Sequence, residues 1–157
     1  MDFDNNIGVS ACLVGKSCRY DGSHCLVEEI SNLLFTGNVI IVCPEELAGL
    51  VTPRDPAIIV GGTGEDVLDG KAKVMTIKGE DLTDAYIEGA KNCLKLLKEN
   101  NIKTVIFKKH SPSCGFGEII SDFSGNVKKG NGVTVALLLR NGIKVMTEED
   151  YLKSIGM

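Results

Sequence analysis

The sequence predicts an α/β fold: a single domain with a mostly parallel, Rossmann-like sheet, helices on both faces and a small antiparallel hairpin excursion. Short β-branched runs alternate along the chain with segments of helical periodicity, which is typical of parallel strands joined by helical crossovers. Residues 39–42 are apolar at every position, as expected for a strand that is buried on both faces. No internal repeat or linker interrupts this pattern, so residues 1–157 are predicted to form one domain.

The first part of the chain is predicted to contain two strands of the sheet and one helix. Residues 7–10 form a short apolar strand, and 12–22 form a loop rich in glycine, serine and charged residues. Ser23 is a suitable N-cap for the helix that follows, Gly37 lies just past its end, and the strand at 39–42 comes next. The apolar positions with helical spacing are Leu26, Ile30, Leu33 and Leu34.

The middle of the chain is predicted to leave the main sheet. Residues 43–56 contain three of the four prolines, so we expect an ordered loop at the sheet edge rather than a helix. Residues 57–60 and 72–77 are strand-like and flank glycine-rich segments, which predicts an antiparallel hairpin excursion. The segment 61–64, Gly-Gly-Thr-Gly, lacks the context of a phosphate-binding loop and is predicted to be a turn.

The second half of the chain is predicted to return to alternating helices and strands. Thr83 caps a predicted helix that continues to about residue 100, and a strand follows at 104–108. The segment after Cys114 is rich in glycine and serine and is predicted to be irregular. The remaining elements are a helix at 132–141, a strand at 143–146 and a terminal helix at 148–155. The buried side of the long helix is marked by Tyr86, Ala90, Cys93, Leu94 and Leu97.

The composition disfavours several classes of partner. The formal net charge of −4 disfavours nucleic acid and favours a small or neutral substrate. The N-terminus does not resemble a secretory signal, and no apolar run approaches the roughly 18 residues of a membrane helix. We therefore expect a cytoplasmic protein whose six cysteines are not paired as disulfides. A domain of this size is also compatible with a homodimer.

Three cysteines each lie just beyond a different apolar run. Cys12 follows the first run, Cys43 the second, and Cys114 lies a few residues after the third. If these runs are parallel strands of one sheet, the three thiols converge at its carboxyl edge, where open α/β sheets bind ligands. Three thiolates with an open fourth position describe a soft metal centre with room for a substrate. The alternative is that each cysteine is a small buried hydrophobic residue.

The other cysteines have less distinctive positions. Cys18 lies six residues after Cys12 and is a less favoured fourth ligand; it would close a tetrahedral, structural site. It could equally be a spare thiol beside the centre. Cys25 and Cys93 fall within predicted helices, where we expect them to belong to the core.

Several polar residues close to these cysteines are candidates for catalysis or substrate binding. Glu45, two residues after Cys43, is a candidate general base toward water, or else a solvated loop carboxylate or an acidic residue at a helix N-terminus. Ser111 and Ser113 flank Pro112 directly before Cys114; their hydroxyls could bind a substrate or sulfur, or the segment could simply end the strand. Arg19 and Tyr20 could lie over the site, although Asp21-Gly22 is also typical of a turn.

Three segments together resemble the thiouracil desulfidase family, a group of small α/β proteins formerly catalogued as of unknown function. They are the stretch from Ser10 to Gly22, Cys43-Pro44-Glu45, and Ser111-Pro112-Ser113-Cys114-Gly115, and the likeness extends to Thr52-Pro53-Arg54 and to 130–134. The chain departs from the family pattern at 47–51, where a second glycine and a proline are expected, and at His110. These departures affect loop shape and substrate selection more than metal binding.

The resemblance implies an oxygen-sensitive [4Fe-4S] cluster bound by Cys12, Cys43 and Cys114, with one iron open to substrate sulfur. It also implies acid–base or positioning roles for Glu45 and Ser111. The expected reaction is non-redox desulfuration of a thiolated pyrimidine base or nucleoside, in which C=S becomes C=O and hydrosulfide is released. The acidic balance disfavours tRNA thiouridine as the substrate.

Two alternatives belong to other functional classes. One is a non-catalytic module in which Cys12, Cys18, Cys43 and Cys114 close a zinc site. The other is a thiol-dependent hydrolase with Cys114 as the nucleophile and His110 or His24 as the base.

Overall fold

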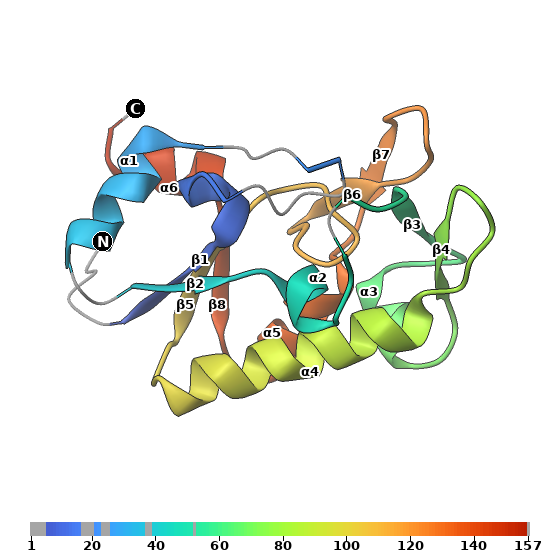
Figure 1. Ribbon diagram of the computed structural model, residues 1–157. Coiled ribbons are helices and arrows are strands. Elements are labelled where there is room, and N and C mark those ends of the chain that lie inside the picture. The colour runs from blue at the N-terminus through green and yellow to red at the C-terminus, as the bar shows by residue number, and fades with distance from the viewer. Residues whose placement is uncertain (1–5, 17–20, 23–25, 37–38, 52, 157) are drawn as a thin grey trace.

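Four parallel strands form the central sheet, in the order β2-β1-β5-β8. The computed structural model describes residues 6–16, 21–22, 26–36, 39–51 and 53–156. Within the sheet, Val9 pairs with Ile41 on one side and with Ile106 on the other, and Ile106 pairs with Met146. The predicted parallel α/β sheet is therefore confirmed (Figure 1). Its strands are β1 (Ile7–Ser10), β2 (Val39–Val42), β5 (Thr104–Phe107) and β8 (Lys144–Thr147).

Helices cover both faces of this sheet, as predicted. On one face, α1 (Glu28–Ser31) and α6 (Glu148–Ser154) contribute Ile30 and Tyr151 to a core with side chains of β1, β5 and β8. On the other face, α4 (Thr83–Glu99) and α5 (Val133–Arg140) pack Leu97 and Leu138 against side chains of β2, β5 and β8. In Figure 1, α1 and α6 lie above the sheet and α4 and α5 lie below it.

The first helix is shorter than the sequence predicted. It begins at Glu28 and passes at Asn32 into a 3₁₀ segment, η2 (Asn32–Thr36). The tighter 3₁₀ winding keeps Ile30 and Leu33 on the buried face but turns Leu34 outward. Leu26 precedes the helix and is 51% exposed, and Leu34 is 39% exposed, so these two of the four helically spaced apolar positions do not belong to the core. The proposed caps, Ser23 and Gly37, lie outside the described residues.

The segment that follows β2 contains a helical turn where a loop was predicted. This is α2 (Pro44–Leu47), and Cys43 is its N-cap. Proline is favoured at the first helical position because the amide proton that it lacks has no intrahelical acceptor there. Glu45 and Glu46 follow in the first turn, where the helix dipole stabilises negative charge. The proline content of 43–56 therefore marked the start of a short helix rather than excluding one.

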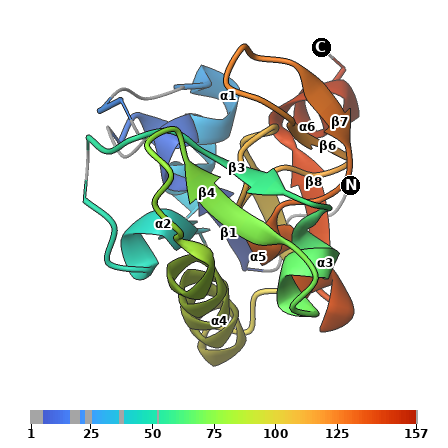
Figure 2. The same ribbon diagram turned by 90° about the vertical axis from the view of Figure 1, so that its right-hand side faces the viewer.

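The antiparallel excursion is confirmed, but its connection is helical. Strands β3 (Ala57–Val60) and β4 (Lys73–Thr76) pair antiparallel, and α3 (Gly64–Leu68) lies between them. The predicted turn at 61–64 thus leads into a helix. Thr63 and Asp66 form a capping box, in which Thr63 N donates to Asp66 Oδ2 at 2.9 Å. Figure 2 shows the β3–β4 pair on the near side of the molecule, with α4 seen end-on beneath it.

The C-terminal half follows the prediction closely, with two differences. The segment after Cys114 is not irregular throughout, because β6 (Glu118–Ile120) and β7 (Val127–Lys129) form a short antiparallel pair. In addition, Thr83 is not the N-cap of α4, since Leu82 occupies that position. The Thr83 hydroxyl instead accepts a hydrogen bond of 3.0 Å from Val74 N, which fixes the start of α4 to β4.

No helix among the described residues is long and apolar enough to cross a lipid bilayer.

Close packing of α4 against α2 requires a glycine in the middle of α4. A Cβ on Gly89 would overlap the Pro44 carbonyl oxygen and lie 2.8 Å from Ala48 Cβ. This contact sets the position of the turn that carries Cys43 and Glu45.

Gly89→Ala should therefore destabilise the protein by about 1–2 kcal/mol. The free-energy cost of overpacking exceeds the roughly 0.5–1 kcal/mol by which alanine is favoured over glycine inside a helix. Urea unfolding followed by circular dichroism measures the change. Lys91→Ala, at an exposed position of the same helix, is the control and should change stability by less than about 0.5 kcal/mol. Equal or greater stability of Gly89→Ala would show that the two helices do not depend on this contact.

Candidate functional site

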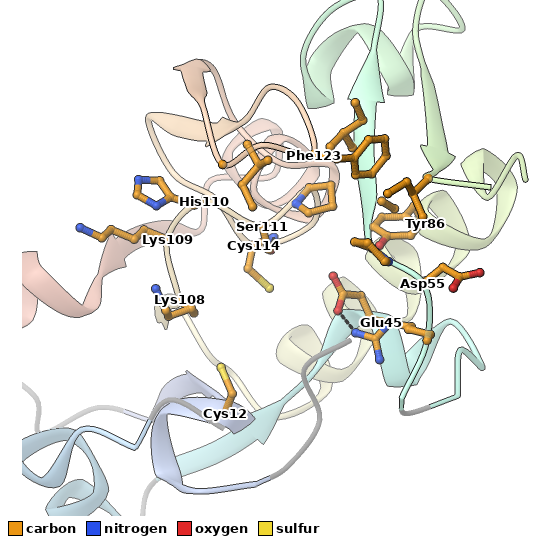
Figure 3. Close-up of a pocket in the computed structure, with 18 of the residues that line it drawn as sticks. Cys12, Glu45, Asp55, Tyr86, Lys108, Lys109, His110, Ser111, Cys114 and Phe123 are labelled. Atoms are coloured by element: carbon orange, nitrogen blue, oxygen red, sulfur yellow. Dashed lines mark hydrogen bonds and ion pairs between the residues drawn. The ribbon is translucent and has the colours of Figure 1, made fainter. Parts of the chain in front are cut away.

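A pocket of about 340 Å³ lies at the carboxyl edge of the parallel sheet. Cys12, Cys43 and Cys114, which follow β1, β2 and β5, all line it. These strands are neighbours in the sheet, so the predicted convergence of the three thiols on one pocket is observed. Figure 3 shows Cys12 and Cys114 on the same side of this pocket, with Glu45 across from them.

Short local structures hold Cys12 and Cys43 at the ends of their strands. Cys12 lies in the 3₁₀ turn η1 (Ala11–Val14), which ends at Gly15 with a φ of 97°. The Cys12 sulfur lies 3.5 Å from the Ser10 hydroxyl oxygen. Cys43 comes directly after β2 and begins α2. Both positions place sulfur at the point where the strand ends. The predicted burial of residues 39–42 on both faces is wrong, because β2 is an edge strand of the sheet and Ile41 is 42% exposed.

A tight turn that is packed on the start of α5 holds Cys114. Cys114 N donates a hydrogen bond of 2.7 Å to Ser111 Oγ, and the Cys114 sulfur lies 3.4 Å from Ser113 Oγ. The turn fits only because the N-cap of α5 is a glycine: a Cβ on Gly132 would lie 2.6 Å from the Ser113 carbonyl oxygen. Burial raises the pKa of the Cys114 thiol, and the nearby Glu45 carboxylate raises it further.

Glu45 is held by contacts from three different parts of the chain. Its Oε2 forms a buried ion pair with Arg54 Nη2, and its Oε1 accepts a hydrogen bond of 3.0 Å from Ser113 Oγ. The phenol of Tyr86, on α4, also interacts with this carboxylate. Burial and the negative charge of Glu45 raise the pKa of Tyr86, so the phenol remains protonated and can donate to its neighbour. The carboxylate is thus fixed in orientation beside the thiols.

The predicted site residues fall into three groups. Ser111 and Glu45 line the pocket together with the three cysteines. Ser113 is 1% exposed and is not among the lining residues, so it reaches the site through Glu45 and Cys114. Its role as a substrate-binding residue stays a prediction. The candidates outside the described residues are Cys18, Arg19, Tyr20, His24 and Cys25.

The remaining cysteine and histidine candidates have distinct environments. Cys93 is buried in the core between α4 and the sheet, as predicted, and burial raises its pKa to about 12. His110 lines the pocket with a φ of 78°, and its Nε2 lies 3.2 Å from Glu118 Oε1. A non-glycine residue in this strained conformation is more frequent at functional sites than elsewhere.

The pocket also contains residues that were not identified as site candidates from the sequence, and three of them bear on its chemistry or its surface. Arg54 belongs to the Thr-Pro-Arg segment, and Tyr86 was assigned only to the buried side of a helix. Both reach Glu45 through tertiary packing, which no local pattern encodes. The third, Phe123, lies in the turn between β6 and β7 and lines the pocket on the side away from Cys12 (Figure 3).

Three consecutive side chains at the pocket, Lys108, Lys109 and His110, each lie next to a carboxylate. Lys108 Nζ lies 3.2 Å from Glu148 Oε2, and Lys109 pairs with Glu149. With the contact between His110 and Glu118, each of these three neighbouring side chains has an acidic partner. This arrangement leaves little net positive charge to attract an anionic ligand.

A parallel α/β sheet with three thiols in a pocket at its carboxyl edge defines a class of protein suited to binding a soft metal centre. Residues 7–150 match the family model of 2-thiouracil desulfurase. The chain therefore belongs to the 2-thiouracil desulfurase family, in agreement with the resemblance in its motifs.

Two relatives extend this assignment. The chain is 50% identical over 143 residues to YbbK of Bacillus subtilis (strain 168), an uncharacterized protein, and the match covers 90% of this chain and 95% of YbbK. The fold matches the solved structure of the [4Fe-4S]-dependent thiouracil desulfidase TudS with a TM-score of 0.83 and 37% sequence identity. That match covers 96% of this chain and 95% of the TudS chain.

The donor set fits a group larger than a single ion. Among the described residues, no three Cys, His, Asp or Glu side chains lie close enough together to bind one metal ion. The thiols of Cys12, Cys43 and Cys114 nevertheless line one pocket, and the first two contribute to the raised pKa of the third. Thiolates spread around a common space are the ligands that an iron–sulfur cluster requires.

Removing Arg54 should destabilise the protein because Glu45 then loses its buried counter-ion. We expect Arg54→Met to lower the free energy of unfolding by about 3 kcal/mol, as for other buried ion pairs that lose one partner. Arg140→Met removes an exposed partner of Asp69 and is the matched control, with a nearly unchanged urea midpoint. Similar midpoints for the two variants would mean that Arg54 does not stabilise a buried charge.

Proposed function

We propose that the chain catalyses iron–sulfur-cluster-dependent, non-redox desulfuration of a thiolated pyrimidine base or nucleoside. The observation that carries this proposal is that three thiols from three neighbouring strands share one pocket with an oriented carboxylate. Membership of the 2-thiouracil desulfurase family and the structural match to TudS support it.

Cys12, Cys43 and Cys114 are the residues that would hold a [4Fe-4S] cluster. Three protein ligands leave one iron without a protein ligand, and a bound cluster supplies a thiophilic Lewis acid that polarises the C=S bond. The hydroxyl groups of Ser10 and Ser113 lie 3.5 and 3.4 Å from the sulfurs of Cys12 and Cys114. Hydrogen bonds to ligand sulfur tune the electronic properties of such centres.

Glu45 acts as the general base in this proposal. It accepts a proton from water, whose oxygen forms a bond to the thiocarbonyl carbon; the C–S bond then breaks, and sulfur leaves as hydrosulfide. The overall change is addition of water and loss of hydrogen sulfide, with no net oxidation or reduction. Arg54 and Ser113 each bind one oxygen of Glu45, which fixes the direction from which the carboxylate meets water.

Ser111 orients the substrate. Its oxygen accepts a hydrogen bond from the Cys114 backbone N–H and lies 3.4 Å from Ser113 Oγ. When a substrate is bound, the Ser111 hydroxyl would turn from Ser113 and donate to a ring oxygen or nitrogen. The matched charges around Lys108 and Lys109 favour a neutral base or nucleoside over a phosphorylated substrate. We place the protein in the cytoplasm, where a reducing environment keeps the thiols available.

The structure offers less support for the two alternative functions. A zinc site needs donors around one ion, and no such group of three is found among the described residues. A nucleophilic cysteine needs a thiolate, whereas burial and Glu45 raise the pKa of Cys114. In addition, His110 faces Glu118, and no contact between it and Cys114 is observed in the described part of the chain.

Desulfuration by the anaerobically reconstituted protein tests the proposal. We expect conversion of 2-thiouracil to uracil with stoichiometric release of sulfide, measured by chromatography and a colorimetric sulfide assay. Glu45→Gln should retain the iron content of the wild type but lose at least about 100-fold in kcat, because the general base is gone.

Glu46→Gln is the matched control, since Glu46 lies beside Glu45 but forms a surface ion pair with Lys16 at 2.7 Å. Its kcat should equal that of the wild type. Full turnover by Glu45→Gln would remove Glu45 from the mechanism. A wild-type protein that binds iron and sulfide yet releases no sulfide from thiouracils or their nucleosides would overturn the proposed function.

A further inference from the structure

Phe123 is an apolar residue that the fold leaves accessible inside the pocket. Its side chain is 42% exposed, although it lines the same pocket as the three thiols. Figure 3 shows Phe123 near Tyr86, on the side of the pocket away from Cys12. An aromatic ring that remains accessible within a ligand-sized pocket is available for contact with a bound molecule.

The turn that carries Phe123 is fixed by its own hydrogen bonds. Asp122 Oδ1 accepts protons from Ser124 N at 2.8 Å and Asn126 N at 3.2 Å, and Asp122 Oδ2 accepts from Asn126 Nδ2 at 2.7 Å. Ser121 N also donates to the Asn126 carbonyl oxygen at 2.7 Å. Phe123 is thus presented by a defined turn.

The same hairpin is joined tightly to the segment that carries Cys114. Ile120 N donates to the His110 carbonyl oxygen at 2.9 Å, and Gly115 N donates to the Ser111 carbonyl oxygen at 3.0 Å. A Cβ on Gly115 would lie 2.7 Å from the Glu118 carbonyl oxygen, so no side chain separates the two segments. The position of Phe123 relative to Cys114 and Ser111 is therefore set by short, local connections.

The lining of the pocket also contains aliphatic side chains, which come from β3, from the residue after β4, from β6 and from the loop before Cys114; they are Ile58, Ile77, Ile120 and Pro112. Asp122, next to Phe123, lines the pocket too, but both of its carboxylate oxygens accept hydrogen bonds from within the hairpin. Figure 3 shows Glu45 between Cys114 and Tyr86, and Arg54 is paired with this carboxylate. A ligand in the pocket therefore meets the thiols and the Glu45 carboxylate, and it also meets an accessible aromatic ring and aliphatic side chains.

We propose that Phe123 is the stacking surface for the substrate ring and selects planar heteroaromatic thiocarbonyl compounds over acyclic ones. This inference rests on the proposed function, because the thiols and the Glu45 carboxylate are assigned there to the reacting C=S group. A pyrimidine presents a flat π-face that stacks on phenylalanine, whereas thiourea carries the same N–C(=S)–N group without a ring. Phe123 is thus a specificity-determining residue rather than part of the acid–base chemistry.

The test compares Phe123→Leu, which keeps an apolar side chain without a π-face, with Phe123→Tyr, which keeps the ring. For anaerobically reconstituted protein, Phe123→Leu should raise the KM for 2-thiouracil and the calorimetric Kd for uracil roughly tenfold, with kcat changed less than about twofold. Phe123→Tyr should restore both values. Val127→Ala is the matched control, because Val127 is 43% exposed in the same hairpin and does not line the pocket.

The outcomes separate this inference from the proposed function. If the wild type releases sulfide from 2-thiouracil and Phe123→Leu has an unchanged KM and Kd, Phe123 does not stack on the substrate. The same conclusion follows if thiourea turnover falls as much as 2-thiouracil turnover. If the wild type has no desulfuration activity, the proposed function fails, and calorimetry with 2-thiouracil still decides whether Phe123 binds the ring. Equal iron contents in all variants exclude a general loss of structure.

Discussion

Parallel pairing of β1 with both β2 and β5 is the constraint on which the site depends. Because the three strands run in one direction, they end at one edge of the sheet, and each is followed within a few residues by a cysteine. A different local structure then holds each cysteine. Cys12 lies in a 3₁₀ turn, Cys43 is the N-cap of a short helix, and Cys114 lies in a turn packed on the start of α5. The thiols converge because of the sheet, and their exact positions are set by these connections.

The segments outside the sheet complete the pocket. Close packing at Gly89 brings α2 and α4 together, so that Glu45 and Tyr86 meet, while Arg54 reaches the same carboxylate from the segment before β3. The β6–β7 hairpin contributes Phe123 on the side of the pocket away from Cys12. The sheet thus supplies the sulfur ligands, and the added elements supply the charge and the apolar surface with which a substrate makes contact.

The sheet and the three thiols were predictable because their signals are local: continuous β-branched runs with a cysteine near the end of each. The Thr63–Asp66 capping box was also a local signal, but the glycines around it favoured a turn. Arg54 could not have been found in this way, since its partner is chosen by tertiary packing. For Ser113, the sequence could not show that its hydroxyl faces Glu45 from behind the pocket wall.

The most direct measurement of the central claim is the iron and acid-labile sulfide content after anaerobic reconstitution of the wild type and four cysteine variants. The account predicts about four of each per chain in the wild type and in Cys93→Ala, whose thiol belongs to the core. It predicts loss of the cluster in Cys12→Ser, Cys43→Ser and Cys114→Ser. Full cluster content in any of these three, or a wild type that binds one zinc ion and no iron, would contradict the assignment of these thiols to a single cluster.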